Sequence, residues 1–267
     1  MNLPLSIRFL LAAAGLVLAA SGATAQSFDS VTLQGDPESS GSGRVGGVLI
    51  SAPRYLGSDE QRTLLLPFID YRWKNGFFAG LGNGIGYKFP SSPQLQYGVR
   101  LSVDFGRKEK RSPLLTGMGD IDASPEAGAF FNYLLTHEWS LKSSLRYGAG
   151  NDHDGLLFDL GLHYATQLAP QWRLGLGVAA TCANASYMQD YFGVTPAQSA
   201  ATGYAVSNVG AGVRDVRGSV TLMHFINRNW IASAVLTVAS LQGDAKNSVI
   251  VRERTPVTGV LGLSYGF

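Results

Sequence analysis

Residues 139–181 read WSLKSSLRYGAGNDHDGLLFDLGLHYATQLAPQWRLGLGVAAT, and their pattern decides the fold. Apolar residues recur at every second position in three segments, which are separated by residues 151–155 and 169–170. Successive side chains leave a β-strand on opposite faces, so this period predicts three strands joined by turns. In each strand the apolar row ends in an aromatic residue, and the other row carries charges and glycines. Segments of about ten residues with this arrangement are typical of a transmembrane β-barrel.

Two sets of side chains follow from this interpretation. The aromatic residues expected to form a girdle at the membrane interfaces are Trp139, Tyr147, Tyr164, Trp172 and Phe267. The residues expected to face the lumen are Arg100, Asp104, Lys142, Arg146, Asp159, His163 and Arg173. Glycines in the same rows would give room for curvature or for bulky side chains across the lumen. A sealed lumen and a narrow conducting lumen are both compatible with this pattern.

The N-terminal residues predict export. Arg8 precedes the apolar run 9–20, and Ala23-Thr24-Ala25 supplies the small residues of a cleavage site. The run is too short for a membrane anchor, because a spanning helix needs roughly 20 apolar residues. We therefore predict a signal peptide over residues 1–25, an N-terminal segment over 26–44 and an outer-membrane barrel over 45–267.

Composition narrows the function. The formal net charge is only +2 and the mean hydropathy is +0.08, so neither a nucleic acid nor another polyanion is expected as a partner. The single cysteine, Cys182, cannot form an internal disulfide.

Alternation continues on both sides of the central stretch and predicts twelve strands in an up-and-down antiparallel barrel. Besides the central three, the predicted strands cover residues 28–33, 45–52, 63–73, 77–87, 95–105, 123–135, 216–225, 230–241 and 257–267. The strand at 28–33 is weak, and we count it because single-chain bacterial barrels have even strand numbers. Pro67 lies inside a predicted strand, which is tolerated only at a sheet edge or a bulge.

This strand order predicts which connections share an end of the barrel. Both termini would lie in the periplasm, with loops 106–121, 183–210 and 243–255 at the cell surface. Connections 53–61 and 90–93 would then be periplasmic, and the Asn-Gly turn at 74–76 would lie on the surface side. The long loop at 183–210 should be partly helical, because Thr195-Pro196 suits a helix N-cap and first position. We expect its motif residues to pack into the barrel mouth: Tyr187, Tyr191, Phe192 and Gly193.

Three motifs have both a chemical and a structural interpretation. The sequence Asp152-His153-Asp154 could suggest acid–base or metal chemistry, but it is also ordinary hairpin-turn composition. The glycines at 80–86 lie within a predicted strand, where a phosphate-binding loop would not form. The basic run at 107–111 could contact lipopolysaccharide phosphates or could be a solvated loop. We expect no catalytic, metal or cofactor site, and therefore no enzyme.

Several segments are familiar from one family. The sequences at residues 53–59, 66–73, 117–123, 187–194 and 263–267 read PRYLGSD, LPFIDYRW, GMGDIDA, YMQDYFGV and LSYGF. On these segments the chain resembles the MipA/OmpV outer-membrane family from about residue 45 to residue 267. The segment at 187–194 is the most specific, because it lies in a loop where a barrel would not demand it.

The resemblance implies an integral outer-membrane protein without enzymatic activity. The founding member of the family is a scaffold that brings a lytic transglycosylase together with a bifunctional penicillin-binding protein. Other members are described as osmotic-response, antibiotic-response or adhesion proteins. We therefore consider a scaffold first, then a narrow channel, then a surface adhesin. The expected partners are outer-membrane lipid and lipopolysaccharide, a lytic transglycosylase and a penicillin-binding protein.

Overall fold

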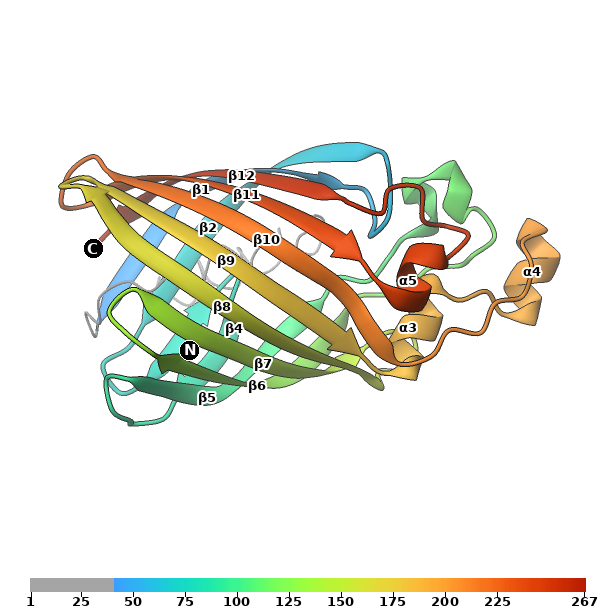
Figure 1. The fold of residues 1–267 in the computed structure, drawn as a ribbon, viewed down its shortest axis with the longest axis horizontal. Helices are drawn as coiled ribbons and strands as arrows, with labels where there is room; N and C mark the ends of the chain where they lie inside the picture. The colour runs from blue at the N-terminus through green and yellow to red at the C-terminus, as the bar shows by residue number, and fades with distance from the viewer. Residues whose placement is uncertain (1–40) are drawn as a thin grey trace, which may run out of the picture.

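Twelve antiparallel strands close into a barrel in the computed structural model, which describes residues 41–267 (Figure 1). The strands are β1 (Ser42–Pro53), β2 (Gln61–Arg72), β3 (Phe77–Gly80), β4 (Gly84–Lys88), β5 (Leu95–Asp104), β6 (Ser124–Leu134), β7 (Trp139–Ala149), β8 (Gly155–Ala169), β9 (Trp172–Ala183), β10 (Gly212–Phe225), β11 (Trp230–Leu241) and β12 (Val257–Gly266). Each strand pairs with its neighbours in sequence, and β12 closes the ring on β1. The all-β up-and-down barrel predicted from the alternation is therefore confirmed.

The number of strands is as predicted, but the twelfth strand has a different origin. The predicted strand 77–87 is a hairpin of two short strands, β3 and β4, which pair with each other around residues 81–83. The glycine-rich row was compatible with one continuous strand. However, Gly84 has a φ of 74°, a value that glycine adopts readily, and the chain reverses direction here. The predicted strand 28–33, the signal peptide and most of segment 26–44 lie outside the described residues.

The alternating apolar rows face outward, as the central stretch predicted. On β8 the side chains of Phe158 and Leu160 are exposed, whereas those of Leu157 and Asp159, which alternate with them, are buried. The same alternation continues through β9, where Leu176 and Val178 are among the exposed residues. A ring of paired strands with an apolar outer face satisfies most of its backbone hydrogen bonds internally, as a membrane-spanning sheet requires.

The interior is less uniformly polar than predicted. Inward-facing apolar side chains of β1, β11 and β12 form a buried cluster of Val48, Ile50, Ala52, Val235 and Val260. Leu66 and Phe68 of β2 pack against this cluster. One side of the interior is therefore apolar, because these strands carry aliphatic residues in both rows.

Helices and long loops gather at one end of the barrel, which we call the long-loop end (Figure 1). The helices are the 3-10 turns η1 (Glu109–Arg111) and η2 (Pro113–Leu115), and the α-helices α3 (Ala185–Phe192), α4 (Pro196–Thr202) and α5 (Gly243–Asn247). The predicted cap is confirmed, since the side chain of Thr195 accepts from the backbone N–H of Gln198 at the start of α4. In the part of the chain described, no helix is long and apolar enough to cross a membrane.

Two connections lie at the opposite end from the one predicted. Connection 53–61 belongs to the long-loop end, where Tyr55 Oη donates to the carbonyl of Ile250 at 2.8 Å. The turn at 74–76 belongs to the other end, which we call the short-turn end. Strand β2 begins after connection 53–61 and crosses the barrel wall to reach this turn. Both errors follow from counting the strand at 28–33, because it reversed the direction assigned to every strand before the β3–β4 hairpin.

The wall of the barrel has one open edge. The N–H of Leu81 donates to the carbonyl of Ile69, and the N–H of Trp73 donates to the carbonyl of Phe77. Odd-numbered residues of β2 therefore direct their backbone groups toward β3, which pairs only with residues 70–72. The odd-numbered residues of β2 that precede Ile69 have no strand partner on this side among residues 41–267. These residues are Gln61, Thr63, Leu65 and Pro67. Pro67 is tolerated in β2 because its missing N–H would point into the gap.

Candidate functional site

A chain of alternating charges crosses the barrel interior from β6 to β10. Its members, in spatial order, are Glu126, Arg146, Asp159, Arg217, Asp215 and Arg214. The successive ion pairs have N···O distances of 3.4, 3.0, 2.9, 3.1 and 2.7 Å. All six residues are buried, and buried charges are stable only when they are paired and hydrogen-bonded. Because cations and anions alternate in equal number, this charge ladder is neutral as a whole.

Strand register brings the centre of the ladder together. Asp159 of β8 lies directly across from Thr181 of β9, and Thr181 Oγ1 donates to its carboxylate at 2.6 Å. Arg146 approaches the same carboxylate from β7, and Arg217 approaches it from β10. Asp159 therefore connects four consecutive strands, so its loss would leave two buried guanidinium groups without their shared carboxylate.

A break in strand register explains why sequence reasoning missed part of the ladder. Between Val213 and Asp215 the pairing of β10 with β9 shifts, as at a β-bulge. In a regular strand two consecutive side chains point to opposite faces, but here Arg214 and Asp215 are both buried. The predicted strand began at residue 216, so neither residue was proposed for the lumen. Glu126 was also missed, although its position two residues before Gly128 puts it in the glycine-bearing row of β6.

Helix α3 closes the long-loop end of the interior. Asn184 caps the helix by accepting from the N–H of Tyr187, and the buried face of the helix carries Tyr187, Met188, Tyr191 and Phe192. The rings of Tyr187 and Tyr191 stack with centroids 4.3 Å apart. Arg214 Nη1 donates to Tyr187 Oη at 2.8 Å, and Tyr191 Oη donates to Asp104 at 2.5 Å. The predicted loop motif thus lies against the charge ladder.

The two stacked tyrosines act as neutral hydrogen-bonding groups. Burial raises the pKa of Tyr187 to about 12, and burial together with the neighbouring Asp104 raises the pKa of Tyr191 well above 10. Both hydroxyl groups therefore keep their protons at neutral pH. Gly193 follows the helix where a side chain would collide with the side-chain amide of Gln189, which itself accepts from the N–H of Val209 at 2.8 Å.

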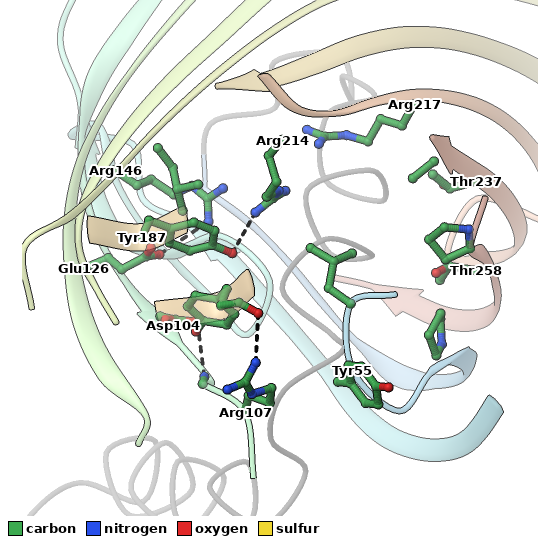
Figure 2. Close-up of a pocket in the computed structure, with 17 residues that line it drawn as sticks. Tyr55, Asp104, Arg107, Glu126, Arg146, Tyr187, Arg214, Arg217, Thr237 and Thr258 are labelled. Atoms are coloured by element: carbon green, nitrogen blue, oxygen red, sulfur yellow. Dashed lines mark hydrogen bonds and ion pairs between the residues drawn. The ribbon is translucent and has the colours of Figure 1, made fainter. Parts of the chain in front are cut away.

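A cavity of about 70 Å³ lies between the ladder and α3 (Figure 2). Four arginines line it, namely Arg107, Arg146, Arg214 and Arg217, together with the carboxylates of Asp104 and Glu126. Figure 2 shows Tyr187 and Arg214 in contact on one side and Tyr55 on the other. The cavity is small and lined by charged groups of both signs, so it suits a small polar solute rather than a polymer.

The remaining lumen candidates lie nearer the short-turn end. Arg100 Nη2 donates to Ser144 Oγ at 2.8 Å, and the guanidinium of Arg173 lies 5.7 Å from the ring centre of Phe225. His163 is buried beside Gly177, where an added Cβ would meet its imidazole ring. Lys142 is partly buried on β7. The candidates are therefore divided between the ladder and the part of the interior nearer the short turns.

Most of the proposed girdle aromatics lie near the short turns. Trp139 packs on Tyr164 with ring centroids 5.0 Å apart, and Trp172 stacks on His224 at 4.2 Å. Phe267 follows the last strand at this end. Tyr147 lies near the other end of β7, where it pairs with Leu156. Four of the five candidates thus mark one interface.

The basic run at 107–111 does not form one exposed patch. Arg107 is buried, and Lys108 pairs with Asp120 at 3.2 Å and also with Asp122. Glu109 accepts from the N–H groups of Gly117 and Gly119. Only Lys110 of this run is exposed, so the run as a whole is structural.

These features define a transmembrane β-barrel whose interior holds paired charges and a short helix at one end. Within residues 41–267, no three His, Cys, Asp or Glu side chains gather as metal ligands would. The family model described as MltA-interacting protein MipA matches residues 45–267. The chain therefore belongs to the MipA family, as the resemblance in its sequence predicted.

Further comparisons concern the fold alone. A search of curated proteins gave no match. Among solved structures, the chain is similar to the KdgM porin at 13% identity and a TM-score of 0.48, covering 84% of this chain and 99% of that one. It is similar to the translocator domain of autotransporter NalP from Neisseria meningitidis at 10% identity, covering 98% of both chains with a TM-score of 0.49. The COG4313 outer membrane channel from Pseudomonas putida F1 shares 12% identity over 88% of this chain and all of its own, at a TM-score of 0.45.

Proposed function

We propose that this protein is a non-enzymatic outer-membrane barrel that scaffolds peptidoglycan-remodelling enzymes. The match to the family of MltA-interacting protein MipA over residues 45–267 carries the proposal, because this family is characterised by an interaction with MltA. The structure supports it in one respect. The charge ladder and the buried face of α3 occupy part of the lumen at one end, which suits a protein that works through its surface. Export by the predicted signal peptide, insertion among outer-membrane lipids and lipopolysaccharide, and the pairing of a lytic transglycosylase with a penicillin-binding protein all belong to this proposal.

The short-turn end is the surface on which these partners would bind. Outer-membrane barrels have short periplasmic turns and longer extracellular loops, so this end would face the periplasm. It comprises the turns at residues 73–76, 89–94, 135–138, 170–171 and 226–229. Lys74 and Arg228 are exposed on two of these turns and offer cationic contacts. Connection 53–61 no longer belongs to the candidate surface, because it lies at the long-loop end.

An affinity pull-down from envelope extracts tests the scaffold role. The wild-type chain should recover a lytic transglycosylase and a penicillin-binding protein, both identified by mass spectrometry. The double variant Lys74→Glu/Arg228→Glu should recover much less of both. Arg54→Glu is the matched control, because Arg54 is an exposed arginine at the opposite end of the barrel. If the wild-type chain recovers neither enzyme, the scaffold proposal fails.

A narrow channel is the second candidate function. The cavity lined by four arginines and two carboxylates favours it, since rings of charged side chains select ions in channels. Planar-bilayer recordings separate the two functions, because a sealed scaffold should give no steps of conductance. If steps are seen, Arg146→Ala should shift the ion selectivity away from anions, since it removes a positive lining charge. Unchanged selectivity in that variant would contradict the channel.

A further inference from the structure

Arg107 is a buried arginine whose backbone is fixed at the top of β5. Its N–H donates to the carbonyl of Ile121 at 2.9 Å and its carbonyl accepts from the N–H of Ile121 at 2.7 Å. This bridge directs the side chain inward to the cavity beneath α3, where Arg107 is only 3% exposed (Figure 2). The guanidinium group is therefore held in a defined place by backbone pairing.

The guanidinium of Arg107 is only partly used. Nη1 donates to the carbonyl of Tyr191 at 2.8 Å. Nε and Nη2 are buried and have no hydrogen-bond partner in the part of the chain that the structure describes. These two nitrogens form one edge of the planar group, which is the edge that binds two oxygens of a carboxylate or phosphate side by side.

Arg107 forms no ion pair with any side chain of the described residues. The other three arginines of the cavity each form an ion pair in the ladder. Asp104 lines the same cavity, but its carboxylate accepts from Tyr191 Oη at 2.5 Å and from the N–H groups of Gly106 and Gly150 rather than from Arg107. The hydroxyl group of Tyr55 donates a hydrogen bond to the carbonyl of Ile250, and burial raises the pKa of Tyr55, so this hydroxyl stays neutral.

A second donor faces the same cavity. Arg214 lines it, is buried, and has an Nη2 group without a partner among the described side chains and backbone. Its other nitrogens bind Asp215 and Tyr187. A carboxylate or phosphate presents two oxygens to the Nε–Nη2 edge of Arg107, whereas one ordered water presents a single oxygen.

We propose that the cavity binds a small oxyanion, a carboxylate or a phosphate, on the Nε–Nη2 edge of Arg107, with Nη2 of Arg214 as an additional donor. The volume agrees with this ligand class. One ordered water needs roughly 10–15 Å³ of such space, so about 70 Å³ holds one small anion and excludes a polymer. The site lies at the long-loop end, away from the short turns of the proposed scaffold, so either proposal can fail without the other.

Calorimetric titration of the mature chain in detergent micelles tests this site. Sodium phosphate and sodium acetate are titrated separately, at an ionic strength held constant with sodium chloride. We expect saturable binding at one site for at least one of them, and the comparison of the two arms assigns the ligand to phosphate or carboxylate chemistry. If neither anion binds the wild-type chain saturably, the cavity holds only water and the proposal is overturned.

Variants locate the binding site. Arg107→Lys keeps a positive charge but replaces the two-donor edge by a single ammonium, so the dissociation constant should rise at least tenfold. Arg214→Lys should weaken binding by a smaller factor. Arg54→Lys is the control and should bind as the wild type does, because Arg54 is half-exposed and already pairs with Glu60. Heat-modifiable migration on gels confirms that each variant is folded. Equal affinity of wild type and a folded Arg107→Lys would place any binding elsewhere and overturn the proposal.

Discussion

Two sides of the barrel wall differ in strand length and in how their polar groups are paired. The wall formed by β7 to β11 has strands of 11 to 15 residues that pair along nearly their whole length. Its inner face carries most of the charge ladder. The wall formed by β2 to β4 contains strands of only four and five residues, and the upper part of β2 is paired on one side alone.

The difference shows where this fold tolerates polar groups. In the long-strand wall every charge in the ladder has a partner, so removing one group leaves another buried and unpaired. In the short-strand wall the unpaired groups are backbone N–H and C=O groups on an edge, and Pro67 removes one of the donors. A substitution should therefore cost much in the first wall and little in the second.

Proline substitution should give the largest contrast. Ala180 of β9 pairs with both β8 and β10. Ala180→Pro therefore removes a backbone hydrogen bond between paired strands and should prevent folding. Thr63 directs its N–H into the gap beside β2, so Thr63→Pro should fold with little loss of stability. Heat-modifiable gel migration and urea unfolding measure both. A Thr63→Pro chain that also fails to fold would mean that the edge of β2 is paired.

Removal of the central carboxylate should have the next largest effect. Asp159→Ala leaves Arg146 and Arg217 without their shared partner and should lower the free energy of unfolding by about 3–5 kcal/mol. Asp70→Ala in the short-strand wall should cost less, about 1 kcal/mol, because its ion-pair partner Arg72, at 3.5 Å, keeps 42% of its side chain exposed and its other partner, Asn83, is neutral. Urea titrations of both variants provide the comparison. Similar losses in the two variants would mean that the ladder is not a stabilising unit.

A pH dependence should follow from Tyr187, which packs against the end of the ladder. Its pKa is raised to about 12 in the folded chain, so the unfolded chain loses this proton first as the pH rises. The stability that Tyr187 contributes is therefore fully present below pH 10 and is lost between pH 10 and about 12, by roughly 1–3 kcal/mol. Tyr187→Phe lacks this titration. The advantage of wild type over Tyr187→Phe in urea unfolding should shrink across this range, and a constant difference would contradict the assignment.

The same contrast separates what the sequence predicts from what it does not. The period of two placed Phe158 outside and Asp159 inside, because alternation in a regular strand depends on local geometry alone. Arg214 and Asp215 escaped prediction, because a bulge depends on pairing with β9 and breaks that alternation. The hairpin at residues 77–88 was missed for a related reason. Its glycines fit a strand as well as a turn, and only the pairing of β3 with β4 distinguishes the two.

The smallest expected effect tests whether anything covers the open edge. Leu65 is 76% exposed, whereas Leu176, which also points outward from the long-strand wall, is 41% exposed because strands flank it on both sides. Leu176→Ala therefore removes contacts with neighbouring side chains as well as with detergent or lipid. Leu65→Ala removes mainly the latter, so it should cost less than about 1 kcal/mol and less than Leu176→Ala. Urea unfolding of both variants in the same micelles gives the comparison. If Leu65→Ala cost as much as Leu176→Ala, the edge of β2 would have to be packed against another segment, and the contrast between the two walls would disappear.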